Sequence, residues 1–204
     1  GLGLLMSMKG DMKPVPFIED AAVPVEQLPE YVRQIEGYCA GLGTPITYYA
    51  HAGAGCLHIR PLVNRRRARE IANMPDIARF AAGLVKGYGG ALSSEHGDGR
   101  TRSWLNEEFH GPALYDLFRQ VKRILDPHNR LNPGIIVDPE PMTAYLRPMA
   151  VDGREAVLSF ADYGADGPLI HGQLNPVPLS SPGGFARAVE MCNGSGDCRK
   201  ASGV

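Results

Sequence analysis

The 204-residue sequence contains few of the features that mark several large protein classes. Its net charge is −1, so neither basic nor acidic residues dominate. Because nucleic-acid binding and binding to acidic membranes usually need a strongly basic surface, we expect neither partner. No run of about 18 apolar residues occurs, so the sequence predicts no transmembrane segment.

Cysteines are also few, and their positions are uneven: Cys39, Cys56, Cys192 and Cys198. This spacing does not form a typical disulfide framework and favours a reducing compartment. We therefore expect a cytoplasmic protein, either in solution or peripheral to a membrane. Residues 1–6 are apolar but too short and too uncharged for a signal peptide. The abrupt start and end indicate a fragment of a longer protein.

What the sequence does contain is the pattern of a packed domain, with 44% hydrophobic residues. Apolar spacings of three and four predict helices over residues 25–42, 76–88 and 112–125. Short runs of β-formers predict strands over residues 16–20, 46–51, 56–60 and 91–94. The order β-α-β-β-α-β over residues 16–94 predicts an α+β domain of ferredoxin-like arrangement, with both helices on one sheet face.

The third helix is extra to that arrangement. We expect its apolar residues to face inward: Leu114, Leu117, Phe118, Val121 and Leu125. Beyond it, many prolines and glycines over residues 137–182 predict an extended irregular tail.

Two histidines flank a glycine-rich turn in the stretch HAGAGCLH, residues 51–58. If Ala54 and Gly55 form a two-residue turn, His51 lies opposite His58 on the same sheet face. Two such imidazoles can bind one divalent ion, although the spacing alone fits ordinary strand histidines equally well. In this register Cys56 faces the other way, so we expect it to lie off the metal.

A second motif, EHGDGR at residues 95–100, follows the last predicted strand. Glu95 can complete a His–His–carboxylate set that leaves positions open for a substrate, and His96 can act as a general base. The alternative is an ordinary tight turn, because Gly97 and Gly99 suit positive φ.

A third motif, LDPHNRLNPG at residues 125–134, reads as a helix end followed by two tight turns. The alternative is that the Asn132 amide contacts a ligand.

Together, five stretches resemble the C-terminal portion of FAD-linked oxidases of the vanillyl-alcohol oxidase/PCMH superfamily: PFIEDAAVPVEQLPEYV, YYAHAGAGCLHIRP, GGALSSEHGDGRTRS, LFRQVKRILDPHNRLNPGIIV and GGFARAVEMCNGSGDCRK. The most similar branch contains D-lactate, glycolate and D-2-hydroxyglutarate dehydrogenase-like proteins that carry an iron–sulfur region. Two departures stand out. Relatives often read HxGDGNLH where this chain reads HAGAGCLH, and Ile18 stands where some carry lysine.

The resemblance implies roles for individual residues. His51, His58 and Glu95 would bind a divalent metal such as Zn or Mn, His96 would remove a proton, and Asn132 would approach the FAD. Arg60 and Arg102 are our own candidates for a substrate carboxylate, because a planar guanidinium suits bidentate binding. Surface ion pairs are an equally open reading of both arginines.

The tail would begin an iron–sulfur segment with Cys192 and Cys198. A [4Fe–4S] cluster needs four thiolates, so we expect the site to be incomplete here. Two cysteines in a flexible tail are the alternative. The implied division is a lead-in over 1–15, a cap domain over 16–136, a linker over 137–183 and the iron–sulfur start over 184–204.

The implied function is the substrate side of a flavin-dependent dehydrogenase or oxidase. It would pass hydride from a D-2-hydroxyacid to FAD with metal assistance, and the electrons would go on to a downstream acceptor. The FAD-binding domain would precede residue 1, so we expect this chain alone to bind FAD weakly or not at all. A non-catalytic ferredoxin-like module for a metal or small ligand, and a degenerate structural remnant, are the competing hypotheses.

Overall fold

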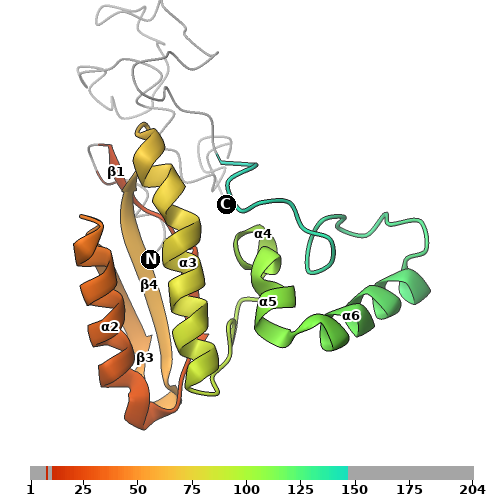
Figure 1. Cartoon of the computed structure of the whole chain (residues 1–204), viewed down its shortest axis with the longest axis horizontal. Helices are drawn as coiled ribbons and strands as arrows, with labels where there is room; N and C mark the ends of the chain where they lie inside the picture. Colours follow the sequence, from red (N-terminus) through yellow and green to blue (C-terminus); the bar gives the residue numbers. More distant parts are fainter. Residues whose placement is uncertain (1–7, 9–10, 147–204) are drawn as a thin grey trace, which may run out of the picture.

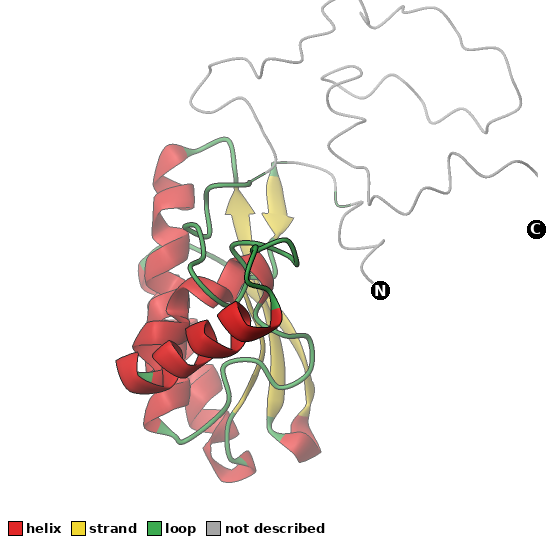
Figure 2. Ribbon diagram, turned by 90° about the vertical axis from the view of Figure 1, so that its right-hand side faces the viewer, coloured by secondary structure: helices red, strands yellow, loops and turns green. Residues whose placement is uncertain are grey.

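The structure, a computed structural model, describes residue 8 and residues 11–146. Its strands are β1 (Met12–Pro14), β2 (Ile18–Ala22), β3 (Ile46–His51) and β4 (Cys56–Asn64). The two long helices, α2 (Leu28–Gly41) and α3 (Ala68–Gly87), lie side by side over the strands (Figure 1). Figure 2 shows these helices as a layer to one side of the sheet. The predicted α+β class is therefore confirmed.

Strand β4 organises the sheet, because β1, β2 and β3 all pair with it, each antiparallel. The predicted strand over residues 91–94 is reduced to an isolated bridge between Ala22 and Ala91. The sheet thus holds three strands of the predicted ferredoxin-like arrangement, a bridge in place of the fourth, and the unpredicted β1.

Side chains alternate between the two faces of β4, as they must in a strand. Leu57, Ile59 and Val63 are at most 2% exposed and belong to the core under the helices. The intervening residues, Cys56, His58 and Arg60, therefore face the opposite side. The helices cover one face of the sheet, and the candidate site residues of β4 lie on the other.

Helix α2 follows a 3₁₀ turn, η1 (Val25–Gln27), so its predicted extent of 25–42 is close to the observed one. Helix α3 begins eight residues before the predicted start at Asp76. The prediction was wrong because Pro75 lacks an N–H donor and normally ends or kinks a helix. Here the helix continues through it, with Met74 buried against the core.

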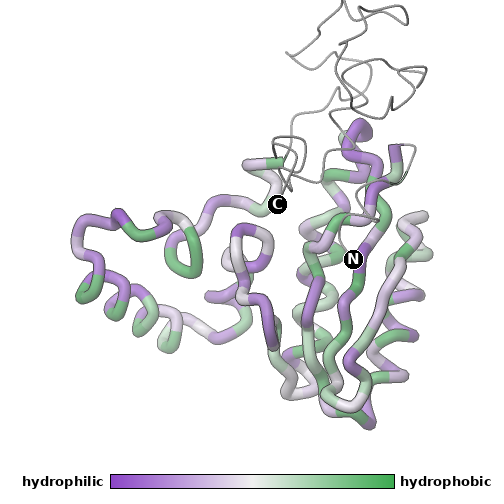
Figure 3. Tube along the Cα trace, turned by 180° about the vertical axis from the view of Figure 1, so that it is seen from behind, coloured by the Kyte–Doolittle hydropathy of each residue, from purple (hydrophilic) through white to green (hydrophobic). Residues whose placement is uncertain are grey.

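The remaining helices are short, except for the last: α4 (Gly99–Arg102), η3 (Ser103–Leu105), α5 (Asn106–His110) and α6 (Pro112–Leu125). Helix α6 has the predicted bounds, but its predicted inward face is exposed apart from the half-buried Phe118. Leu117, Val121 and Leu125 are 52%, 55% and 73% exposed, and Tyr115 is its buried residue. Figure 3 shows α6 alternating between apolar and polar residues, and Figure 1 shows it projecting away from the sheet.

Among the described residues, none of the helices combines the length and apolar character that crossing a bilayer requires. Residues 137–146 contain turns but no helix or strand, in line with the irregular tail. The rest of the predicted linker, and Cys192 and Cys198, lie outside the described residues.

Candidate metal and catalytic site

The hairpin between β3 and β4 is wider than the two-residue turn predicted. Residues Ala52–Ala54 form the 3₁₀ turn η2, and Gly55 closes it with a φ of +67°. His51 therefore lies opposite Cys56 rather than His58, and His58 lies opposite Tyr49. Because the shift is two residues, an even number, both histidines still share one face. Their ring centroids are 5.1 Å apart.

The same register corrects the prediction for Cys56, which was expected to face away from the histidines. Its Sγ lies 3.7 Å from His58 Nε2 and accepts a hydrogen bond of 3.3 Å from Ser94 Oγ. Burial raises the pKa of the Cys56 thiol, which favours the neutral form over the thiolate that binds metals. Cys39 is buried in the core, as expected.

The Glu95 carboxylate is the meeting point of the predicted ligands. Its Oε1 lies 3.7 Å from His51 Nε2, and its Oε2 lies 3.5 Å from His58 Nε2 and 3.6 Å from His96 Nε2. One ligand atom from each of His51, His58 and Glu95 fits within 4.8 Å of the other two. Ligand atoms bound at 2.0–2.2 Å to one tetrahedral zinc lie about 3.3–3.6 Å apart, so the contacts of Glu95 with His51 and His58, at 3.7 and 3.5 Å, suit one divalent ion.

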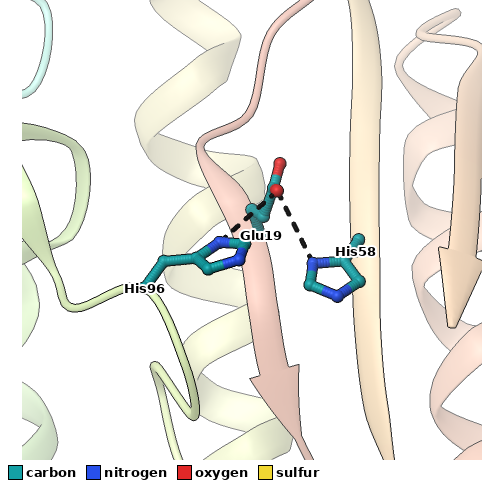
Figure 4. Close-up of side chains that lie close together, drawn as sticks. All are labelled: Glu19, His58 and His96. Atoms are coloured by element: carbon teal, nitrogen blue, oxygen red, sulfur yellow. Dashed lines mark ion pairs between the residues drawn. The ribbon is translucent and has the colours of Figure 1, made fainter. Parts of the chain in front are cut away.

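A β-bulge brings two further acidic residues to the site. The pairing of β2 with β4 shifts register between Ile18 and Ala21, so the two residues Glu19 and Asp20 together occupy the position opposite His58. Asp20 has a φ of +54°, an uncommon conformation for a residue with a side chain. Glu19 Oε1 lies 3.5 Å from Nδ1 of both His58 and His96 (Figure 4).

Sequence reasoning missed Glu19 and Asp20. The available signal was two adjacent carboxylates within an otherwise apolar stretch, PFIEDAAV. Buried acids without a partner are costly, so such a pair indicates partners elsewhere in the fold.

Asp20 fixes the loop that carries Glu95 and His96. Its Oδ2 accepts hydrogen bonds from the backbone N–H groups of both residues, at 2.8 and 2.7 Å, and from Ser93 Oγ at 2.9 Å. Burial alone would raise the pKa of the Asp20 carboxyl, but these backbone donors and Arg102 hold it below its ordinary value. A buried carboxylate on β2 therefore sets the position of two site residues that lie 75 and 76 positions later in the chain.

Both candidate arginines are buried, so the surface-ion-pair reading does not describe them. Arg102 Nη1 lies 2.6 Å from Asp20 Oδ1, and its guanidinium also donates to the carbonyl oxygens of Glu19 and Gly97. Arg60 Nη2 donates to Glu19 Oε1 at 2.9 Å, and its guanidinium lies over the Tyr49 ring. Contact of either arginine with a substrate stays a prediction.

Asn132 is exposed and has a φ of +50°. Asp126 anchors this segment, since its carboxylate accepts hydrogen bonds from the N–H groups of Arg130 and Leu131. Within the described residues, no hydrogen bond joins Asn132 to His51, His58 or His96. Its approach to FAD stays a prediction.

Comparison with known proteins places these features in a family. Residues 2–136 match the family of FAD linked oxidases, C-terminal domain. The chain is 38% identical over 152 residues to D-2-hydroxyglutarate dehydrogenase of Pseudomonas putida, which covers 74% of this chain and 15% of that protein. The Escherichia coli D-2-hydroxyglutarate dehydrogenase is 38% identical over 151 residues, covering 74% and 14%.

A more distant relative is the D-lactate dehydrogenase of Archaeoglobus fulgidus, 35% identical over 133 residues, covering 65% of this chain and 29% of that protein. The chain thus spans less than a third of the length of each of these relatives. Since the family match extends over residues 2–136, the chain belongs to the family of FAD-linked oxidase C-terminal domains.

Proposed function

We propose that this chain is the substrate side of an FAD-linked dehydrogenase that oxidises a D-2-hydroxyacid. In this proposal His51, His58 and Glu95 hold a divalent ion such as Zn or Mn, and His96 removes the substrate proton. One observation carries the proposal: three imidazole Nε2 atoms lie 3.5–3.7 Å from the Glu95 carboxylate. The names of the relatives, D-2-hydroxyglutarate and D-lactate dehydrogenase, support the substrate class.

The burial of the cluster suits catalysis at an open metal centre. The His58 side chain is 1% exposed, whereas those of His51 and Glu95 are 54% and 40% exposed. A buried ligand fixes the centre, and the exposed side leaves room for a substrate. When bound, the ion would supply Lewis acidity to the substrate hydroxyl, and FAD would accept the hydride from the α-carbon.

His96 is placed to receive the hydroxyl proton. Its side chain is 46% exposed, and its Nε2 faces Glu95 Oε2, the oxygen that His58 Nε2 also faces. A substrate oxygen bound near that point would be within reach of the imidazole, which is the geometry that general base catalysis requires.

For the substrate carboxylate, the contacts favour Arg60 over Arg102. Both terminal nitrogens of Arg102 are already bonded to protein oxygens. Both arginines have a buried Nε without a hydrogen-bond partner, but the hydrogen bonds of Arg60, to Glu19 and at 3.4 Å to the Tyr49 hydroxyl, involve Nη2 alone. We therefore propose Arg60 as the carboxylate contact and a structural role for Arg102.

Other parts of the protein would supply the cofactors and the electron acceptor. The exposed apolar face of α6, with Leu117, Val121 and Leu125, is our candidate surface for the FAD-binding domain. A [4Fe–4S] segment beginning at Cys192 and Cys198 would pass the electrons to the acceptor.

The test is anaerobic reduction of the flavin in the full-length protein by D-2-hydroxyglutarate and D-lactate. We expect at least one to bleach the flavin, and we expect a chelator to abolish the bleaching until Zn or Mn is restored. His96→Gln should retain the metal but slow bleaching by roughly 10²–10⁴-fold. Glu36→Ala, on the exposed face of α2, serves as the matched control with an unchanged rate.

Bleaching that persists after the metal has been removed would contradict the metal assistance. A protein that binds the metal but whose flavin no D-2-hydroxyacid reduces would instead support the non-catalytic binding module.

A further inference from the structure

Glu19 occupies a position that the proposed mechanism does not use. It lies on the bulge of β2, its side chain is 8% exposed, and its Oε1 accepts a hydrogen bond of 2.9 Å from Arg60 Nη2. Figure 4 shows the rings of His58 and His96 approaching its carboxylate from two different elements, β4 and the loop before α4. In both rings the atom that faces Glu19 is Nδ1, at 3.5 Å.

The opposite nitrogens of the same two rings face the proposed metal centre. Nε2 of His58 and Nε2 of His96 lie 3.5 and 3.6 Å from Glu95 Oε2. Each imidazole therefore lies between two carboxylates, with Glu19 at Nδ1 and Glu95 at Nε2. A histidine that uses one nitrogen for a metal or a proton needs an acceptor for the N–H on the other.

Two buried atoms in this arrangement lack a hydrogen-bond partner, His58 Nδ1 and Glu19 Oε2. Buried polar groups are nearly always paired, so the two orphans need an explanation. The 3.5 Å from His58 Nδ1 to Glu19 Oε1 is longer than a good hydrogen bond. A hydrogen bond from His58 Nδ1–H to Glu19 Oε2 would pair both groups.

We propose that Glu19 is a positioning residue that accepts the Nδ1–H of both His58 and His96. It thereby directs Nε2 of His58 toward the metal and Nε2 of His96 toward the substrate. This inference rests on the proposed metal centre and adds a single carboxylate that orients a ligand and the base together.

The alternative role for Glu19 is that of a metal ligand, because its carboxylate and one nitrogen each of His58 and His96 also fit within 4.8 Å of one another. The Arg60 guanidinium argues against it. Its positive charge lies 2.9 Å from the same Glu19 oxygen, where it would repel a divalent cation bound there. The contact instead fixes Glu19 as an anionic acceptor.

The experiment measures zinc binding by the 204-residue chain, since all the proposed ligands belong to it. Cys192→Ser and Cys198→Ser are introduced throughout, so that tail thiolates cannot bind zinc. Ring ¹⁵N shifts of the zinc-loaded chain identify which nitrogen of each histidine carries the metal and which carries a proton. Competition with a chelator gives the affinity.

We expect zinc on Nε2 of His51 and His58, with protons on Nδ1 of His58 and His96. Glu19→Gln should weaken zinc binding by about 10- to 100-fold, the usual effect of losing a carboxylate that hydrogen-bonds to a metal ligand. It should also remove the signals of the protons on Nδ1 of His58 and His96. Because that change leaves Arg60 without its partner, Glu19→Gln with Arg60→Gln should show the same loss. Glu36→Gln, which changes an exposed carboxylate of α2, is the control and should change the affinity by no more than about twofold.

Zinc on Nδ1 of His58 and His96 would make Glu19 a ligand and overturn the inference while leaving a metal centre in place. Unchanged affinity and unchanged ring protonation in both Glu19 variants would also overturn it. A parent chain that binds no zinc would defeat the metal part of the proposed function, and this inference with it.

Discussion

Helices α3 and α6 both carry an apolar stripe, but within the described residues only the stripe of α3 is buried. Ile77, Ala81 and Val85 of α3 are at most 3% exposed, whereas Leu117 and Val121 of α6 are more than half exposed. The sheet with α2 and α3 thus completes its own core, whereas the α6 region presents an apolar surface that the described residues leave exposed. The proposed metal ligands all come from the first region, and Asn132 comes from the second.

The two regions also hold their loops with carboxylates in different surroundings. Asp20 is fully buried, and its carboxylate accepts hydrogen bonds from two backbone N–H groups and forms an ion pair with Arg102. Asp126 lies at the end of α6 and binds Lys122 and two backbone N–H groups. We therefore expect substitutions in the first region to affect stability and metal binding together, and those in the second to affect neither strongly.

The largest effect should come from Asp20→Ala. It leaves Arg102 buried without its partner and removes the acceptor for three donors of the 93–96 loop, so we expect a loss of about 3–5 kcal/mol in the free energy of unfolding. Urea unfolding measures it. Asp116→Ala, an exposed carboxylate of α6, is the control and should stay within about 0.5 kcal/mol. A loss below about 1 kcal/mol for Asp20→Ala would remove its anchoring role.

A pair of helix substitutions tests the comparison itself. Ile77→Ala opens a cavity in the core and should cost about 2–5 kcal/mol. Leu117→Ala removes an exposed side chain and should change the stability of this chain by no more than about 0.5 kcal/mol. Thermal unfolding of the two variants measures the difference. Equal losses would mean that α6 is packed against this chain after all.

A smaller difference in stability is expected between alanine substitutions of two glycines in the hairpin between β3 and β4. A Cβ on Gly55 would lie 1.9 Å from the Val23 carbonyl oxygen, and its φ of +67° disfavours a side chain. Gly55→Ala should therefore cost about 1–3 kcal/mol and weaken zinc binding by moving His51 relative to His58. Gly53→Ala meets nothing within 4 Å and has no positive φ, so it should do neither. Chelator competition measures the zinc affinity of the two variants, and urea unfolding measures their free energy of unfolding.

The smallest effect concerns acid. The Lys122 ammonium, followed by the backbone N–H groups of Arg130 and Leu131, lowers the pKa of Asp126 from 3.8 to about 2. A lowered folded-state pKa stabilises the fold above the ordinary value, and this contribution disappears as the pH falls through about 2. The stability advantage over Asp126→Asn should therefore be constant above pH 5 and shrink between about pH 4 and 2. An advantage that grows as the pH falls would contradict this assignment.

Much of the first region follows from the sequence because its signals are local. Helix periodicity and β-formers predict the main elements, and an even shift in the hairpin kept His51 and His58 on one face despite the wrong register. The bulge at Glu19 and Asp20 could not be foreseen, because it depends on how β2 pairs with β4. The start of α3 was missed because propensity disfavours Pro75, while burial of Met74 and Ile77 overrides it.

The second region was predicted less well for a different reason. The bounds of α6 are local and were right, but a stripe of apolar residues does not reveal which surface will cover it. The inward assignment of Leu117 and Val121 assumed a cover that the described residues do not provide.

Zinc stoichiometry by elemental analysis of the 204-residue chain, in the Cys192→Ser and Cys198→Ser background, tests the central claim most directly. The account predicts one ion per chain, lost in His58→Ala and Glu95→Gln and retained in Glu36→Gln. A parent chain without zinc, or an ion that survives both ligand substitutions, would contradict it.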